Sequence, residues 1–403
     1  MEFSDIEPKP LTQPPALFHA TGSLAIGQIT FWAATFYLLP ALMLDIEQNV
    51  GWTKTQISGA MTGAIIVSAI CARPVGRIID TGYGAYLMGI GGTGAGLLLV
   101  LCSQVELIWQ FYGCWLGLGA CMAAILYEPC FSIVTRHHGI NARRAITHIT
   151  LIAGFAGTIA YPLATWLSAS FDWRVTFIFF GFFVLMLAVP CTLYAILELQ
   201  KNLPAIQISP PSSKTTETGK RRSFWLIAGA FTLGGINHTM ILSHLLPMLS
   251  ERGISTQLAV FAAMLIGPMQ VVARLMFMTY ERQVSTQSGA LICLWGLGFA
   301  SALLWLSGIN LPLIYAATAL HGATWGLVSI ARPTLIREVL GGEGFGATSG
   351  SVATIAILGV AIAPSLGAWL WSLGGYQLML SVGTMLTLTG GSFIWLLRKQ
   401  PNT

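Results

Sequence analysis

Charged residues are scarce in this sequence. Asp, Glu, Lys and Arg make up 9% of its 403 residues, whereas a soluble domain contains roughly 25%. The seven cysteines include no Cys-x-x-Cys pair, so we expect small buried hydrophobic side chains rather than disulfides or metal ligands. Residues 1–15 are acidic and proline-rich and lack the basic start and apolar core of a signal peptide. We therefore expect a cytosolic tail there, and the scarcity of charge excludes an ordinary soluble domain.

Apolar residues are what the sequence has in excess. Hydrophobic residues account for 55% of the chain, with 44 glycines and 13 tryptophans. This composition is typical of helical membrane proteins with close helix packing and interfacial aromatic side chains. One membrane-spanning helix needs about 20 apolar residues. Twelve such runs are predicted, at 18–44, 55–79, 83–103, 106–135, 144–170, 173–198, 223–250, 257–280, 286–308, 310–337, 345–372 and 375–397. We expect an all-α membrane protein with twelve transmembrane helices.

Lys and Arg are concentrated in alternate connections between these runs. If both termini are cytoplasmic, 14 basic residues fall in inner segments and only three, Lys54, Arg174 and Arg252, in outer ones. Because cytoplasmic connections carry the excess of basic residues, we expect both termini and the connection at 199–222 to be cytoplasmic. The net charge of +5 then reflects membrane orientation and does not indicate nucleic-acid binding.

The two halves of the sequence repeat each other. Leu126-Tyr127-Glu128-Pro129 in the fourth run has the same form as Ile330-Ala331-Arg332-Pro333 in the tenth. The other matches, in chain order and with similar offsets, are Leu38-Leu39-Pro40 with Leu245-Leu246-Pro247, Gly76-Arg77 with Ala273-Arg274, and Gly157 and Pro162 with Gly359 and Pro364. We expect an N-terminal tail at 1–17, six-helix bundles at 18–198 and 223–398, a linker at 199–222 and a C-terminal tail at 399–403.

The twelve spans, the repeat and the long central connection resemble the major facilitator superfamily of secondary transporters. The segment from Gly76 to Gly84 is similar to the family signature Gly-x-x-x-Asp-Arg-x-Gly, with Asp80 at the aspartate and Thr81 replacing the arginine. The resemblance implies two pseudo-symmetric six-helix bundles that rock around a midplane site. It also implies a conformational latch at Asp80. With it we group one glycine and four arginines near the expected cytoplasmic ends of spans as latch or gate residues: Gly76, Arg77, Arg136, Arg73 and Arg274.

Within this family, three short motifs resemble those of bacterial relatives of the monocarboxylate and oxalate–formate transporter group. They are Gly51-Trp52 before the second span, Tyr127-Glu128-Pro129 in the fourth, and Asp172-Trp173-Arg174 before the sixth. The resemblance implies transport of a small organic anion or carboxylate.

Glu128 and Arg332 are charges inside apolar runs. Such a charge costs about 3 kcal/mol on insertion scales and persists where it meets water or a partner. The fourth and tenth helices line the central cavity in the family, so we expect Glu128 to act as proton carrier or gate residue and Arg332 to bind an anion. A permanent ion pair that only fixes helix packing is the alternative. The other residues expected to bind substrate or protons are Tyr127, His238, Asn237, Gln28, Trp32, His321 and Trp325.

The predicted function is secondary active transport of a small organic anion by proton-coupled alternating access. Proton-antiport efflux of small organic compounds is the alternative. A membrane-embedded enzyme would need a clustered nucleophile and base or a metal triad, and a sensor would carry a large soluble domain, so we expect neither. We expect a multi-pass monomer in the lipid bilayer of a bacterial inner (cytoplasmic) membrane. Its partners are a small-molecule substrate and protons, without nucleic acid, metal or cofactor, and the proton-motive force supplies the energy.

Overall fold

Helices account for nearly all of the chain that the structure describes. The computed structural model describes residues 15–138, 142–202, 218–280, 283–340 and 345–398, and no strand occurs in these ranges. The first half contains α1 (Pro15–Trp32), η1 (Ala33–Tyr37), α2 (Leu38–Val50), α3 (Lys54–Asp80), α4 (Gly84–Cys102), α5 (Ile108–Ile125), α6 (Tyr127–His138), α7 (Ala142–Ala153), α8 (Ala156–Ser170), α9 (Trp173–Phe183), η3 (Val184–Ala188) and α10 (Val189–Asn202). The second half contains α11 (Thr218–Glu251), α12 (Thr256–Met264), α13 (Ile266–Tyr280), α14 (Thr286–Leu306), α15 (Leu311–Leu340) and α16 (Phe345–Arg398).

Eleven apolar helical segments in the described ranges are long enough to cross a membrane. The last of them supplies two spans, because α16 leaves helical geometry at Gly374 (φ −158°, ψ 27°) and Gly375 (φ 66°, ψ −173°). The positive φ of Gly375 lies in a region that glycine adopts readily and other residues do not. The chain reverses there, and the described helices provide twelve spans in all.

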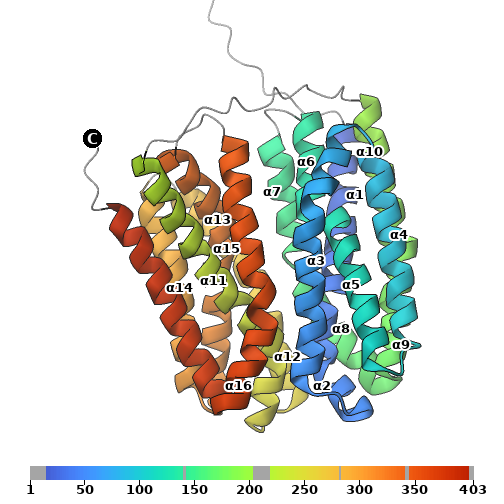
Figure 1. The fold of residues 1–403 in the computed structure, drawn as a ribbon, viewed down its shortest axis with the longest axis vertical. Coiled ribbons are helices and arrows are strands. Elements are labelled where there is room, and N and C mark those ends of the chain that lie inside the picture. The colour runs from blue at the N-terminus through green and yellow to red at the C-terminus, as the bar shows by residue number, and fades with distance from the viewer. Residues whose placement is uncertain (1–14, 139–141, 203–217, 281–282, 341–344, 399–403) are drawn as a thin grey trace, which may run out of the picture.

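The twelve spans form two bundles that lie side by side, α1 to α10 in one and α11 to α16 in the other (Figure 1). We call these the N-terminal and C-terminal bundles. The expected all-α membrane fold with two six-helix bundles is confirmed. The described helices extend into the predicted linker at 199–222, since α10 ends at Asn202 and α11 begins at Thr218.

Glycines at matching positions of the two bundles let helices cross closely. Gly119 of α5 packs against the backbone of Ala64 in α3, and Gly322 of α15 packs in the same way against Ile266 in α13. A Cβ atom at either glycine would collide with the opposite backbone, so both crossings require glycine. Small residues at helix crossings are the usual packing device in membranes, and here they recur with the sequence repeat.

Two spans contain a π-helical turn next to a proline. In span one, η1 precedes Pro40, and in span six, η3 precedes Pro190. Proline has no N–H to donate to the carbonyl four residues earlier, which favours a local widening of the helix. Such π-helical turns are common at functional sites, and η1 carries Tyr37 at its end.

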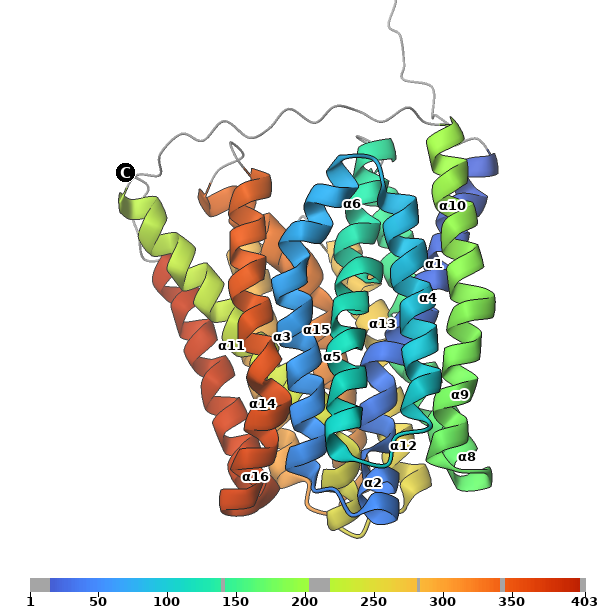
Figure 2. The same cartoon turned by 45° about the vertical axis from the view of Figure 1, so that its right-hand side comes forward.

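The bundles contact each other mainly toward one end of the molecule. We call the end where α10 stops and α11 starts the linker face, and the opposite end, where α2 and α11 stop, the far face. Thr62 Oγ1 and Ser365 Oγ lie 2.8 Å apart across the two bundles. The Tyr161 hydroxyl donates to the Leu242 carbonyl over 3.0 Å. All four residues lie in the far-face half of their spans. Figure 2 shows α3 beside the first arm of α16, and the far face is closed by these contacts.

Candidate functional site

The Leu-Tyr-Glu-Pro segment lies at a break in span four. α5 ends at Ile125, Leu126 is extended (φ −80°, ψ −158°), and α6 restarts at Tyr127. The amide Nε2 of Gln28, fully buried in α1, donates to the Ile125 carbonyl over 2.7 Å. A carbonyl freed at a helix break needs such a partner in a membrane, because water is absent from the hydrocarbon core. Gln28 therefore holds span one against the break.

Aromatic side chains hold the start of α6 in place. The Tyr127 ring lies between Trp32, at a centroid distance of 4.8 Å, and Phe131, which stacks at 4.8 Å with an interplanar angle of 15°. Three of the predicted site residues, Gln28, Trp32 and Tyr127, thus meet at one place between spans one and four. The indole Nε1 of Trp32 is buried and has no hydrogen-bond partner among the described residues.

Glu128 occupies the first turn of α6, and its side chain is exposed. Its carboxylate forms no ion pair within 4 Å and no hydrogen bond with another described residue. A carboxylate in the first turn of a helix is favoured by the helix dipole. The carboxylate is therefore stabilised by its position while its oxygen atoms stay available.

Arg332 faces Glu128 from α15 of the opposite bundle. Glu128 lies ten residues, and Arg332 eight residues, from the linker-face end of its helix, which places both about 12–15 Å inside the bundle. They are near enough to interact electrostatically, but their charged atoms are not within 4 Å of each other. The half-buried guanidinium of Arg332 makes no hydrogen bond to any residue in the described ranges. Within the part of the chain that the structure describes, it is a cation inside a span without a direct partner.

Arg274 bridges the two bundles. Its Nε donates to the Gly326 carbonyl of its own bundle over 3.0 Å, and its Nη1 donates to the Thr150 carbonyl of α7 over 3.1 Å. Its charge also reaches Tyr37 and Tyr127. Both hydrogen-bond acceptors are neutral carbonyls, so this contact can be broken without leaving a carboxylate unpaired.

A second polar cluster lies within the C-terminal bundle. His238 Nδ1 and His321 Nε2 are 2.9 Å apart, so one ring nitrogen donates and the other accepts. The His238 ring stacks on Trp325 at a centroid distance of 3.9 Å and an angle of 9°. Asn237, next in sequence, donates to Ser301 over 3.0 Å. The structure thus brings His238, His321 and Trp325 together from α11 and α15, whereas Asn237 faces α14.

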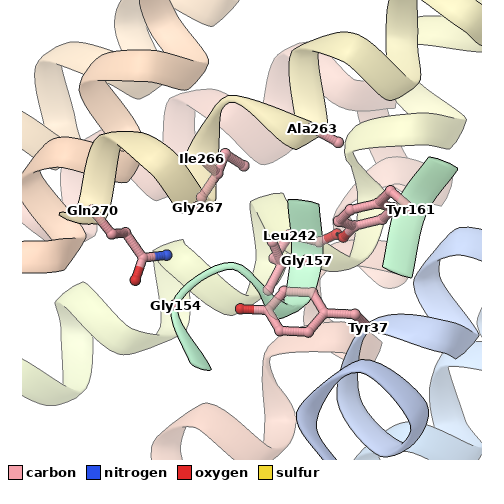
Figure 3. Close-up of a pocket in the computed structure, with 9 residues that line it drawn as sticks. All are labelled: Tyr37, Gly154, Gly157, Tyr161, Leu242, Ala263, Ile266, Gly267 and Gln270. Atoms are coloured by element: carbon pink, nitrogen blue, oxygen red, sulfur yellow. Dashed lines mark hydrogen bonds between the residues drawn. The ribbon is translucent and has the colours of Figure 1, made fainter. Parts of the chain in front are cut away.

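A narrow pocket lies between the bundles, close to Tyr37. Figure 3 shows the Tyr37 hydroxyl and the Gln270 amide approaching the same space from opposite bundles. The pocket is lined by Tyr37, Gly154, Gly157, Tyr161, Leu242, Ala263, Ile266, Gly267 and Gln270. The sequence prediction omitted Tyr161 and Gln270 from the site. Polar side chains inside spans, one of them beside Pro162, were the signal that could have found them.

The predicted latch segment is only partly described. The side chains of Arg73, Asp80 and Arg136 lie outside the described residues. Arg77 is exposed in the last turn of α3, and a Cβ atom at Gly76 would meet no neighbour within 4 Å. None of the described helices approaches Gly76 closely in this conformation. Glycine is needed instead at Gly82, whose φ is 95°.

The described residues form no metal-binding cluster and no disulfide. No three His, Cys, Asp or Glu side chains in the described ranges gather where they could hold a metal ion. The seven cysteines are all free thiols. The arrangement that remains is a set of unpaired or weakly paired polar groups between two helical bundles, which suits reversible binding of a solute.

Comparison with known proteins agrees with this architecture. The family model described as Major Facilitator Superfamily matches residues 24–283. A crystal structure of a bacterial homologue of the human lysosomal transporter Spinster, inward-facing and occupied, is similar with 14% identity and a TM-score of 0.71, covering 96% of this chain and 98% of that one. The same homologue in an inward-facing, unoccupied conformation gives 12% identity and a TM-score of 0.61, covering 96% and 95%. No curated protein matches the chain. With a family model over more than half of its length and two bundles of six spans, this multi-pass membrane protein belongs to the Major Facilitator Superfamily and is a secondary transporter that works by alternating access, not an enzyme.

Proposed function

We propose that this transporter carries a small organic anion, of the monocarboxylate class, together with a proton. The observation that carries the proposal is Arg332, a guanidinium within a span that has no hydrogen bond to the described residues. A lone cation in a span costs about 3 kcal/mol on insertion scales. A carboxylate ligand offsets that cost, because guanidinium and carboxylate form two parallel charge-assisted hydrogen bonds.

Glu128 supplies the proton site in this proposal. It faces Arg332 at the same depth without touching it. A substrate carboxylate that binds Arg332 takes the place of Glu128 as the countercharge, and a proton then neutralises Glu128. Substrate and proton are therefore bound together, as symport requires. Tyr127, Trp32 and Gln28 hold the backbone around this carboxylate.

Direction and membrane orientation are part of the same proposal. The concentration of basic residues in alternate connections supports a cytoplasmic linker face. The contacts that close the far face, and the likeness to inward-facing structures, support release toward the linker face, once the hydrogen bond from Arg274 to Thr150 between the bundles breaks. We infer a bacterial inner-membrane importer that releases its substrate at the linker face. The motif Tyr127-Glu128-Pro129, which resembles the monocarboxylate transporter group, supports a small organic anion as substrate.

Uptake into proteoliposomes tests the proposal. The purified protein is reconstituted, and labelled small carboxylates are offered with and without an inwardly directed proton gradient. We expect at least one monocarboxylate to accumulate against its own gradient only when protons flow inward, and a protonophore to abolish the accumulation. Accumulation when protons flow outward would indicate antiport instead. Transport of uncharged or cationic solutes, with no carboxylate transported, would overturn the substrate class.

A further inference from the structure

The basic residues of the far face have different structural roles. Arg174 donates to the carbonyls of Ser103 and Val105 at 2.8 and 2.7 Å, within the N-terminal bundle. Arg252 donates to the carbonyls of Leu304 and Gly308 within the C-terminal bundle. Both arginines hold a loop of their own bundle.

Lys54 reaches from one bundle to the other instead. It is the first residue of α3, directly after the N-cap residue Thr53, whose side chain forms a capping box with Gln56. A cation at a helix N-terminus opposes the helix dipole, so local helix stability does not explain a lysine there. Only 10% of its side chain is exposed.

The Lys54 ammonium lies in a cage of aromatic rings and carboxylates. It sits 4.3 Å from the centroid of the Trp371 ring and 5.9 Å from that of Tyr376. Glu251 lies 4.0 Å away, and Glu47 of its own bundle lies 3.9 Å away. The Trp371 indole donates to Glu251 over 2.9 Å, which orients ring and carboxylate together. Aromatic faces combined with a carboxylate are a recognition site for ammonium groups.

The cage also contains polar atoms that nothing in the described chain satisfies. The hydroxyl of Tyr376, whose residue is 6% exposed, has no hydrogen-bond partner, and neither has Nδ1 of the fully buried His244 beside it. Buried polar groups are usually paired. Two unpaired groups next to a buried ammonium indicate a polar site that Lys54 fills incompletely.

We propose that Glu251, Trp371 and Tyr376 form an ammonium-binding site on the C-terminal bundle, occupied by Lys54 when the far face is closed and open to a primary alkylammonium ligand when it is not. Lys54 and Glu47 belong to the N-terminal bundle, so alternating access must withdraw them from the cage each time the far face opens. The cage then faces water with its carboxylate and two rings intact. A ligand bound there competes with Lys54 and keeps the far face open. This inference needs the two bundles to separate but does not depend on the organic anion or on Glu128.

Chemical rescue of a truncated lysine tests the site. Lys54→Ala removes the atoms of n-propylammonium, so that compound is the probe, with 1-propanol as the uncharged control of the same length. Spin labels at Gln104→Cys and Ile309→Cys, on a background lacking the native cysteines, report the far-face distance in the full-length protein. We expect Lys54→Ala to raise the ratio of open to closed far face by about tenfold. In this variant n-propylammonium can take the place of the missing ammonium between Glu47 and Glu251. It alone should therefore return the ratio toward the wild-type value.

The matched control is Lys54→Met, which removes the charge but fills the same space. We expect it to open the far face as Lys54→Ala does and to show no rescue. Equal rescue by 1-propanol, or no shift in either variant, would overturn the site. If Lys54→Ala does not fold, n-propylammonium is titrated into the wild type. There it must raise the open fraction, and Glu251→Gln must abolish that effect; an unchanged wild type overturns the proposal.

Discussion

At the scale of single residues, the partners of each charge distinguish the arginines of this protein. Arg174 and Arg252 donate to carbonyls at the far face of their own bundles, and Arg274 joins carbonyls of both bundles. Arg332 has none of these contacts, although it lies deeper than a loop residue. Residues of one type therefore serve as a loop clamp, a bridge between bundles and, in our proposal, a substrate site.

Replacing Arg332 tests its role in anion binding. We expect Arg332→Gln to weaken binding of the transported carboxylate by about 10- to 150-fold, because a charge-assisted hydrogen bond of about 1.5–3 kcal/mol is lost. Equilibrium binding to the purified protein measures this. Arg332→Lys should bind with intermediate affinity, since it keeps the charge but loses the planar fork. Arg174→Gln is the control and should leave affinity unchanged. Unaltered binding in Arg332→Gln would exclude it from the site.

Replacing Glu128 separates proton coupling from substrate exchange. We expect Glu128→Gln to lose accumulation driven by a proton gradient and to retain exchange of substrate, since exchange does not require the proton to be released. Uptake and counterflow in the same proteoliposomes measure the two activities. The swap of Glu128→Arg with Arg332→Glu should restore neither expression-normalised transport nor coupling. Full gradient-driven transport by the swapped protein would mean that the pair only fixes helix packing.

At the scale of helices, the repeated motif has two different structures. Span four breaks at Leu126, whereas α15 continues without a break through Arg332. Gln28 stabilises this break, because its side-chain amide donates a hydrogen bond to the Ile125 carbonyl. The position in span seven that corresponds to Gln28 in the repeat is Gly235, which has no side chain to donate. Span ten therefore lacks an equivalent of the Gln28 contact, and its helix runs on past Pro333.

Removing the Gln28 side chain tests this account of the break. We expect Gln28→Leu to destabilise the folded protein by about 1–3 kcal/mol, because the Ile125 carbonyl is left buried without a donor. Thermal unfolding in detergent should show a lower midpoint, and transport should slow. Thr30→Val is the matched control, since the Thr30 hydroxyl donates only to Ile26 of its own helix at an exposed position. Equal midpoints for both variants would contradict the role of Gln28.

At the scale of the whole molecule, transport requires that the far-face contacts between bundles break. We expect the pair Thr62→Cys and Ser365→Cys, on a background lacking the native cysteines, to form a disulfide, because the native oxygen atoms lie 2.8 Å apart. Oxidation should hold the far face closed and stop transport, and a reductant should restore it. Each single cysteine variant should transport under both conditions. Undiminished transport by the oxidised pair would show that this contact persists through the cycle.

The orientation of the molecule in the membrane is a separate prediction. Reporter fusions after residue 220 and near Val105 should report opposite sides, with the former cytoplasmic. Basic residues in alternate connections are the physical reason. Both reporters on one side would contradict the order of the spans, and reversed sides would contradict the orientation alone.

The sequence by itself determined the class, the number of spans and the family. Apolar length and sparse charge are properties of each segment, and a membrane accepts only helices with those properties. The boundary inside α16 was also predicted, between apolar runs that end at 372 and begin at 375, and the structure has its turn at Gly374 and Gly375. The finer resemblance to monocarboxylate transporters, and the roles of the predicted site residues, stay predictions.

Tertiary structure alone decided which of the candidate residues meet. His238 and His321 are 83 positions apart and come within 2.9 Å because α11 packs on α15. Asn237, adjacent to His238, points to another helix, since neighbouring residues face different sides. Lys54 looked like an isolated outer charge, yet its cage is assembled from α11 and α16 of the other bundle. Local pattern predicts which segment a residue belongs to, whereas the partners of a polar side chain depend on how helices distant in sequence cross.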